Sequence, residues 1–144
     1  MEILFVCTGN ASRSVMGEIM FRQYLAERGH EDIHCSSAGT DAIEGLDACP
    51  QTMEVCEEIG VDLSGHIRRM LTKELVDAAD VVVVMQQSHI DAVTAFGGQE
   101  KLHLLGGGIK DPYPNPIGQF YVARDAVIAA RPALYEDILR RREK

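Results

Sequence analysis

The sequence predicts an α/β fold with a parallel sheet covered by helices on both faces. Two runs, Ile3–Val6 and Val81–Met85, are short and continuously apolar, which is typical of strands buried on both faces. Weaker strands are expected over 33–36 and 101–105, and segments with helical periodicity separate the four, which indicates βαβ units. With 144 residues, 46% of them hydrophobic, residues 1–144 are expected to form a single domain around one core.

Two helices are expected in the first half of the chain. The first runs from Ser14, a residue type that caps helix N-termini, to Gly29, which suits the left-handed position after a helix. The second begins at Pro50, because proline is tolerated in the first helical turn, and ends at Gly60. Its inward side is expected to carry Met53, Cys56 and Ile59.

Three more helices are expected in the second half, over 72–78, 88–96 and 119–141. Pro132 lacks a backbone donor inside the last of these, so that helix is expected to kink or to start afresh near residue 131. The proline-rich segment 111–116 can be neither a helix nor a central strand.

The charge balance excludes some classes of partner. A formal net charge of −8 argues against binding of nucleic acid or of an anionic membrane, since both need a basic surface. No apolar run approaches the roughly 20 residues that span a bilayer. The N-terminus has neither a basic segment nor a small-residue cleavage site, so no signal peptide is expected. Any phosphate site would have to be a local positive pocket in this negative chain.

Cysteine usage predicts a reduced, cytoplasmic protein with four free thiols. Helical positions for Cys49 and Cys56 would place them roughly 10 Å apart, beyond disulfide reach. No C-x-x-C pair occurs, so no metal site is expected. The four cysteines are Cys7, Cys35, Cys49 and Cys56.

The segment from Cys7 to Ser14 is the candidate functional site. Parallel sheets bind ligands at the carboxyl ends of their strands, and Cys7 follows the end of the first strand. A loop that closes onto a helix N-terminus turns several backbone N–H groups toward one concavity, where the helix dipole adds positive charge. Arg13 adds a planar fork that matches two phosphate oxygens, and the same field favours the Cys7 thiolate. Gly9 and Asn10 tolerate the left-handed backbone that a tight cradle requires.

This segment resembles the signature of the low-molecular-weight protein-tyrosine phosphatases. The resemblance implies a four-stranded parallel sheet of order 2-1-3-4 with helices on both faces, and hydrolysis of phosphotyrosine in proteins without a metal or cofactor. It also implies a transient complex with the phosphorylated protein, and we expect a monomer. The similarity covers nearly the whole chain in the family's order, through Phe5–Ser14, Ser36–Gly39, Gly60–His66, Leu71–Thr72, Ala79–Asp80 and Asp111–Tyr113.

The resemblance further implies roles for individual residues. Cys7 would be the nucleophile that takes the phosphoryl group, and Asp111 would protonate the leaving group and then activate water. Ser14 would stabilise the thiolate, and Tyr113 would form a wall for the substrate ring. The loop would be held in shape by Asn10, Ser37 and His66. Phosphate would be bound by Arg13 and by the backbone of Thr8, Gly9, Asn10, Ala11 and Ser12.

Two loop positions depart from the family pattern. Ser12 stands where a second cysteine is common, so the family's protective disulfide cannot form and Cys7 is expected to over-oxidise more readily. Ala11 matches neither the larger aliphatic residue usual in tyrosine-directed members nor the threonine of the related protein-arginine phosphatases. Phosphoarginine therefore stays an alternative substrate, although the Asp-Pro-Tyr triplet at 111–113 favours phosphotyrosine.

Three other functions fit the sequence less well. Arsenate reduction on the same fold uses two further cysteines after the third strand, where this chain has only Gln86–His89 and no later cysteine. A sugar-phosphotransferase carrier has less need of Arg13 or Asp111, and a catalytically dead binding module would not keep nucleophile, arginine and acid together. His89 and His103 are expected to be a helix-start and an edge histidine without function.

Overall fold

The computed structural model describes residues 1–143 and has a central sheet of four parallel strands in the order β2-β1-β3-β4. The strands are β1 (Glu2–Cys7), β2 (His34–Gly39), β3 (Val81–Val84) and β4 (Leu102–Leu104). The predicted fold class and strand order are confirmed. β2 extends beyond the expected 33–36, because Ser37 to Gly39 pair in register with Phe5 to Cys7. This extension brings the end of β2 beside the Cys7–Ser14 loop.

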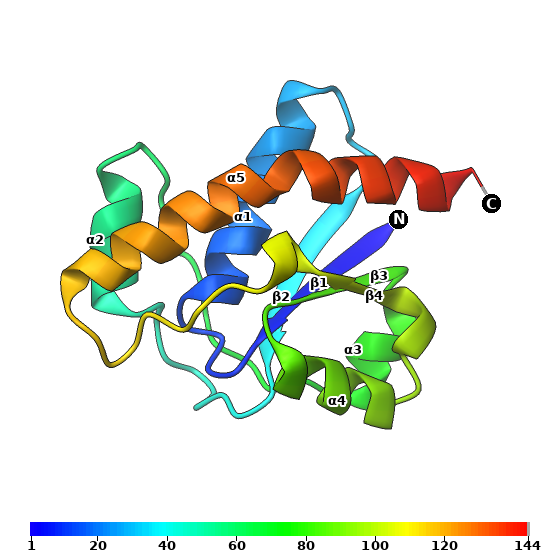
Figure 1. The fold of residues 1–144 in the computed structure, drawn as a ribbon, viewed down its shortest axis with the longest axis horizontal. Helices are drawn as coiled ribbons and strands as arrows, with labels where there is room; N and C mark the ends of the chain where they lie inside the picture. Colours follow the sequence, from blue (N-terminus) through cyan, green and yellow to red (C-terminus); the bar gives the residue numbers. More distant parts are fainter. Residues whose placement is uncertain (144) are drawn as a thin grey trace.

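Helices cover both faces of the sheet (Figure 1). The cluster of buried side chains on one face is shared with α1, α2 and α5, and the smaller cluster on the other face with α3 and α4. Two 3₁₀ turns, η1 (Gln99–Lys101) and η2 (Leu105–Gly107), flank β4. The helices are α1 (Arg13–Glu27), α2 (Pro50–Glu57), α3 (Lys73–Ala78), α4 (Gln87–Ala95) and α5 (Ile117–Arg142).

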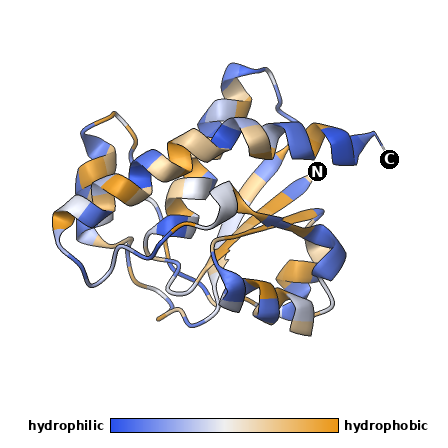
Figure 2. Cartoon of the chain, in the orientation of Figure 1, coloured by the Kyte–Doolittle hydropathy of each residue, from blue (hydrophilic) through white to orange (hydrophobic). Residues whose placement is uncertain are grey.

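Alternate side chains of the two central strands enter the two halves of the core. Ile3 and Phe5 belong to the larger cluster, whereas Leu4 and Val6 belong to the smaller one, as the period of two in a strand requires. All four residues of β3 are fully buried. Figure 2 shows the apolar colour concentrated along these strands and mixed along the helices. The continuous apolar runs therefore did mark strands covered on both faces.

The helix ends differ from the expectation at two places. α1 begins at Arg13 with Ser12 in the cap position, so Ser14 lies inside the helix rather than at its cap. α2 ends at Glu57, and Ile59, expected to face inward, is 44% exposed. Because Ile59 lies beyond the last helical turn, the helical period no longer places it on the buried side. Gly29 takes the predicted left-handed conformation, with φ at 77°.

The expected restart near residue 131 does not occur, because α5 runs through Pro132 without a break (Figure 1). A proline inside a helix leaves the carbonyl four residues earlier without its usual amide donor. That carbonyl belongs to Ile128, and it accepts a hydrogen bond of 3.0 Å from Nε of Arg131 instead. Within residues 1–143, none of the helices combines the length and apolar composition that a membrane crossing needs.

Candidate active site

The Cys7–Ser14 loop joins the carboxyl end of β1 to the start of α1. Asn10 adopts a positive φ of 51°, which makes it the left-handed residue that the loop was predicted to need, whereas Gly9 does not. Asparagine is one of the few residue types that tolerates this conformation. The chain therefore turns sharply at Asn10 and brings Arg13 back toward Cys7.

The carbonyl groups of this loop are tied outward. Five of them accept a hydrogen bond. Asn10 O lies 2.7 Å from His66 Nε2, and each of the remaining four oxygens accepts from a backbone amide at 2.8 or 2.9 Å. Among residues 1–143, no protein acceptor takes the amides of residues 8–12. The loop thus has acceptors that are occupied and donors that are left for a ligand, which is what an anion-binding nest requires. The tied carbonyls are those of Cys7, Thr8, Asn10, Ala11 and Ser12.

The hydrogen-bond directions around Cys7 follow from the side chain of Asn10. Its Nδ2 can only donate, and it lies 2.9 Å from Ser14 Oγ and 3.0 Å from Ser37 Oγ. Ser14 Oγ therefore accepts from Asn10, and its own proton is left for the sulfur of Cys7 at 2.9 Å. A hydroxyl proton directed at sulfur stabilises the thiolate over the thiol.

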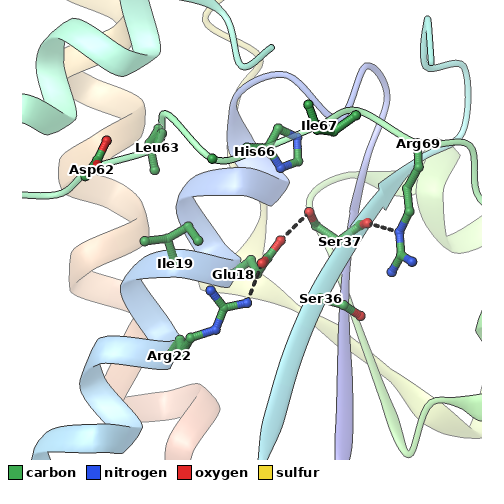
Figure 3. Close-up of a pocket in the computed structure, with 11 residues that line it drawn as sticks. Glu18, Ile19, Arg22, Ser36, Ser37, Asp62, Leu63, His66, Ile67 and Arg69 are labelled. Atoms are coloured by element: carbon green, nitrogen blue, oxygen red, sulfur yellow. Dashed lines mark hydrogen bonds and ion pairs between the residues drawn. The ribbon is translucent and has the colours of Figure 1, made fainter. Parts of the chain in front are cut away.

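The other side of the loop is supported by a network that Figure 3 shows in part. Ser37 accepts from Asn10, so its own hydroxyl donates to Glu18 at 2.6 Å, and Glu18 also pairs with Arg22. The backbone amide of Arg69 donates to Asn10 Oδ1 at 2.9 Å, and its Nε donates to Ser37 O at 2.7 Å. Glu18 and Arg69 were not anticipated from the sequence.

The supporting residues line a cavity of about 440 Å³ on that side of the loop, with Glu18, Ser37, His66 and Arg69 in its wall (Figure 3). His66 Nε2 faces a carbonyl oxygen, so this nitrogen carries the proton. The structure thus brings the predicted set Asn10, Ser37 and His66 together.

Gly39 lies directly against the loop. A Cβ built on it would be 2.5 Å from Thr8 O and 2.8 Å from Asn10 N, closer than real Cβ contacts. The backbone of β2 can approach the loop this closely only because residue 39 has no side chain. Glycine at position 39 therefore determines how closely the Cys7–Ser14 loop packs against the end of β2.

Arg13 is 2% exposed, and three groups from distant segments hold its guanidinium. Nη1 donates to Gln86 Oε1 at 2.6 Å and to Ile109 O at 2.8 Å. Nη2 lies 3.5 Å from Asp111 Oδ2, so the acid predicted about a hundred residues away in the sequence is brought to the loop. Gln86 and Ile109 were not anticipated, because neither residue type indicates such a contact by itself.

A cavity of about 390 Å³ opens on the side of Cys7; we call it the Cys7 cavity. Its lining includes Cys7, Arg13, Ala11, Asp111 and Tyr113, so it joins the predicted nucleophile, acid and wall. The Asp111 side chain is 45% exposed and accepts from the amide of Tyr113 at 3.1 Å, which orients it within a turn. Tyr113 itself is 65% exposed, at the rim of the cavity.

His89 lies in the first turn of α4, as expected, but it is not a surface residue. The side chain is fully buried, with Nε2 3.0 Å from Thr8 Oγ1 and Nδ1 3.2 Å from the amide of Met85. Burial, with a smaller contribution from the Arg13 charge, lowers the pKa of His89 to about 4. The ring is therefore neutral at pH 7. His103 pairs with Asp137 at 2.8 Å, away from the loop.

Two of the other thiols are protonated, and the side chains described do not form a metal site. Burial raises the pKa of Cys35 to about 12 and that of Cys56 to about 11, so both stay protonated. All four cysteines are free. Across residues 1–143, no group of three or more His, Cys, Asp or Glu side chains is arranged to hold a metal ion.

Comparisons with known proteins identify the family of this chain. Residues 2–144 match the family model described as low molecular weight phosphotyrosine protein phosphatase. A low molecular weight protein-tyrosine-phosphatase Ptp from Acinetobacter johnsonii is 36% identical over 118 residues, which cover 78% of this chain and 80% of the relative. A protein-arginine-phosphatase from Bacillus subtilis (strain 168) is 33% identical over 134 residues, which cover 87% and 88%.

A solved structure of the low molecular weight protein tyrosine phosphatase from T. tengcongensis superposes with a TM-score of 0.87 at 31% identity, covering 95% of this chain and 99% of that one. The sequence resemblance, the fold and the relatives therefore agree. This chain belongs to the low molecular weight phosphotyrosine protein phosphatase family of hydrolases.

Proposed function

We propose that this protein hydrolyses phosphotyrosine in proteins through a cysteinyl-phosphate intermediate. The observation that carries the proposal is the polarity of the Cys7–Ser14 loop. Five of its carbonyl oxygens accept hydrogen bonds, while the amides of residues 8–12 have no acceptor within residues 1–143, and the loop lines the cavity that contains Cys7. A phosphoryl group would receive these preformed donors, together with Arg13, as its negative charge spreads over three oxygens.

The first chemical step joins Cys7 to the phosphoryl group. The sulfur attacks phosphorus and an S–P bond forms while the bond from phosphorus to the tyrosine oxygen breaks. Asp111 gives its proton to that oxygen, because a phenol leaves more readily than a phenolate. Arg13, held by Gln86 and Ile109, would bind two equatorial oxygens as a fork.

The second step returns Cys7 to its starting state. Water attacks the cysteinyl phosphate, Asp111 takes a proton from that water, and the S–P bond breaks to release inorganic phosphate. The departing sulfur is a thiolate, which the Ser14 hydroxyl at 2.9 Å would stabilise. We further expect a transient complex with the phosphorylated protein, a monomeric enzyme and a cytoplasmic location.

Phosphoarginine is the second candidate substrate. A relative that is 33% identical over 87% of this chain is named a protein-arginine-phosphatase. The Cys7 cavity also contains two carboxylates, Asp41 and Asp111, which suit a positively charged guanidinium leaving group. Tyr113 and Ile43 in the same lining suit an aromatic ring instead.

Hydrolysis of matched phosphotyrosine and phosphoarginine peptides tests the proposal. We expect the wild type to prefer phosphotyrosine, Cys7→Ser to be inactive, and Asp111→Asn to lose roughly 10²- to 10⁴-fold in kcat on phosphotyrosine, the range for a lost general acid. Asp91→Asn, a change on the exposed surface of α4, serves as the control. Activity retained by Cys7→Ser would refute the mechanism. A preference for phosphoarginine peptides would mean that phosphoarginine, and not phosphotyrosine, is the substrate.

A further inference from the structure

The segment that follows β3 contacts both ends of the Cys7–Ser14 loop. Gln86 accepts from Arg13, near the end of the loop, at 2.6 Å. Three residues later, His89 lies 3.0 Å from the hydroxyl of Thr8, the residue after the nucleophile. The Gln86 contact acts on the side chain of Arg13, whereas the His89 contact acts on Thr8, which lines the Cys7 cavity and whose backbone amide has no acceptor within residues 1–143.

The hydrogen bonds of His89 fix its tautomer. The amide of Met85 can only donate, so Nδ1 of His89 accepts and carries no proton. The neutral ring must then be protonated on Nε2, and Nε2 donates to Thr8 Oγ1. If both ring nitrogens were protonated, the Nδ1–H of His89 would point at the N–H of Met85, so that two donors would face each other. Burial and the nearby Arg13 keep the pKa of His89 near 4, in agreement with this neutral form.

Thr8 is held at two points. Its carbonyl accepts from the amide of Asp41 at 2.9 Å, and its hydroxyl accepts from His89 on the opposite element, α4. The Thr8 carbonyl shares a peptide plane with the Gly9 amide, and the Cys7 carbonyl, which accepts from Thr40, shares one with the Thr8 amide. The bond from His89 holds Thr8 at the junction of these two planes and so limits their rotation. The amides of Thr8 and Gly9, which have no acceptor within residues 1–143, therefore keep one direction.

We propose that His89 is a positioning residue for the phosphatase reaction: it donates to Thr8 and so orients the first amides of the Cys7–Ser14 loop toward the phosphoryl group. This inference rests on the function proposed above. His89 does not line the Cys7 cavity, so it acts through Thr8 and not on the substrate. A histidine that only filled space in the core could be replaced by an apolar side chain without an effect on phosphate binding.

Two substitutions remove the contact from either side. Thr8→Val deletes the hydroxyl at nearly constant volume, and His89→Leu deletes the donor. Each is expected to lower kcat/KM for p-nitrophenyl phosphate about five- to tenfold, and to raise the Kd for inorganic phosphate by a similar factor, as loss of one neutral hydrogen bond predicts. The double variant should be no worse than either single one, because both remove the same interaction.

Further variants separate positioning from stability. His89→Gln can donate and accept in the same pattern, so it should restore much of the activity. His103→Leu also removes a hydrogen-bonded histidine, but one that pairs with Asp137 away from the loop. It should lower the melting temperature and leave kcat/KM of the folded enzyme unchanged.

The inference is overturned if folded His89→Leu binds inorganic phosphate as the wild type does, or if the effects of Thr8→Val and His89→Leu simply multiply. Should His89→Leu fail to fold, Thr8→Val together with His89→Gln still decides. Phosphate binding measured by titration calorimetry keeps this test separate from the proposed function. If the wild type hydrolyses no phosphate ester, that function fails, while the binding data still test the role of His89.

Discussion

Gly39 and Thr8 meet backbone to backbone: a Cβ on Gly39 would lie 2.5 Å from the carbonyl oxygen of Thr8. That oxygen is also tied to the amide of Asp41 at 2.9 Å, so it cannot move away freely. The end of β2 therefore supports the Cys7–Ser14 loop through direct backbone packing. The Ser36–Gly39 segment was identified above by its resemblance to the family, and this contact gives the physical reason why its last residue must be glycine.

Replacing Gly39 by alanine is expected to lift the loop and to lower kcat/KM for p-nitrophenyl phosphate by roughly tenfold or more. Overpacking of a close contact costs about 1–3 kcal/mol, and here that strain falls on the residues proposed to bind phosphate. Gly118→Ala is the control, because a Cβ at Gly118 would meet no atom within 4 Å. Steady-state kinetics and thermal melts of both variants provide the measurement. Unchanged kinetics in Gly39→Ala would show that the end of β2 can move to accept the methyl group without a change in the loop.

Ser14→Ala tests the direction of the proton beside Cys7. Because Asn10 Nδ2 donates to Ser14, the serine hydroxyl is free to donate to sulfur. Loss of a hydrogen bond to a charged group costs about 1.5–3 kcal/mol, so kcat/KM should fall about ten- to a hundredfold. The rate of Cys7 alkylation by iodoacetate at pH 7 should fall as well, since the thiolate is the nucleophile.

Ser12→Ala is the matched control for that experiment. Its hydroxyl lies in the same loop but bonds Thr52 Oγ1 at 2.7 Å rather than the sulfur of Cys7. The alkylation rate of Ser12→Ala should stay close to that of the wild type. Equal alkylation rates in Ser14→Ala and in the wild type would mean that Ser14 does not stabilise the thiolate.

His89 makes the stability of the fold depend on pH. Its pKa is about 6.5 when unfolded and about 4 when buried, so the unfolded chain binds the proton first as pH falls. The free energy of unfolding should therefore decrease as pH is lowered from 6.5 toward 4, by about 3 kcal/mol for this residue alone. Urea denaturation at several pH values measures the slope. In His89→Gln the slope across this window should be shallower, and equal slopes would contradict the assignment.

Local sequence signals predicted the strands and the Cys7–Ser14 loop, because buried parallel strands and tight anion cradles have strong local patterns, whereas the strand order came from the family resemblance. The supporting contacts could not be found this way. Glu18, Gln86 and His89 act through partners 19, 73 and 81 residues away. An isolated glutamate, glutamine or histidine in or next to a helix carries no sign of such a partner. The restart expected at Pro132 does not occur for a different reason: the donor to Ile128 O is the side chain of Arg131, and the helical pattern does not show which side chains replace a missing backbone donor.

Oxidation of Cys7 is the last consequence of the loop sequence. Peroxide converts a thiolate to sulfenic acid, and a second peroxide converts sulfenic acid to sulfinic acid, which thiols do not reduce. A neighbouring cysteine can intercept the sulfenic acid as a disulfide with release of water, but the loop offers Ser12 at this position. The burial of Cys35 and Cys56 raises the pKa of both thiols and makes them poor partners. Cys49, buried in the wall of the Cys7 cavity, is the remaining thiol near Cys7.

We therefore expect prolonged peroxide treatment to inactivate the wild type in a way that dithiothreitol does not reverse. Ser12→Cys should recover most of its activity with dithiothreitol, because the introduced cysteine can form a disulfide that protects Cys7. Mass spectrometry of the Cys7 peptide should show sulfinic acid in the wild type and a disulfide in Ser12→Cys. Rapid recovery of the wild type would contradict this expectation. If Cys49→Ser then abolished that recovery, the protecting thiol would be Cys49, reached across the cavity instead of along the loop.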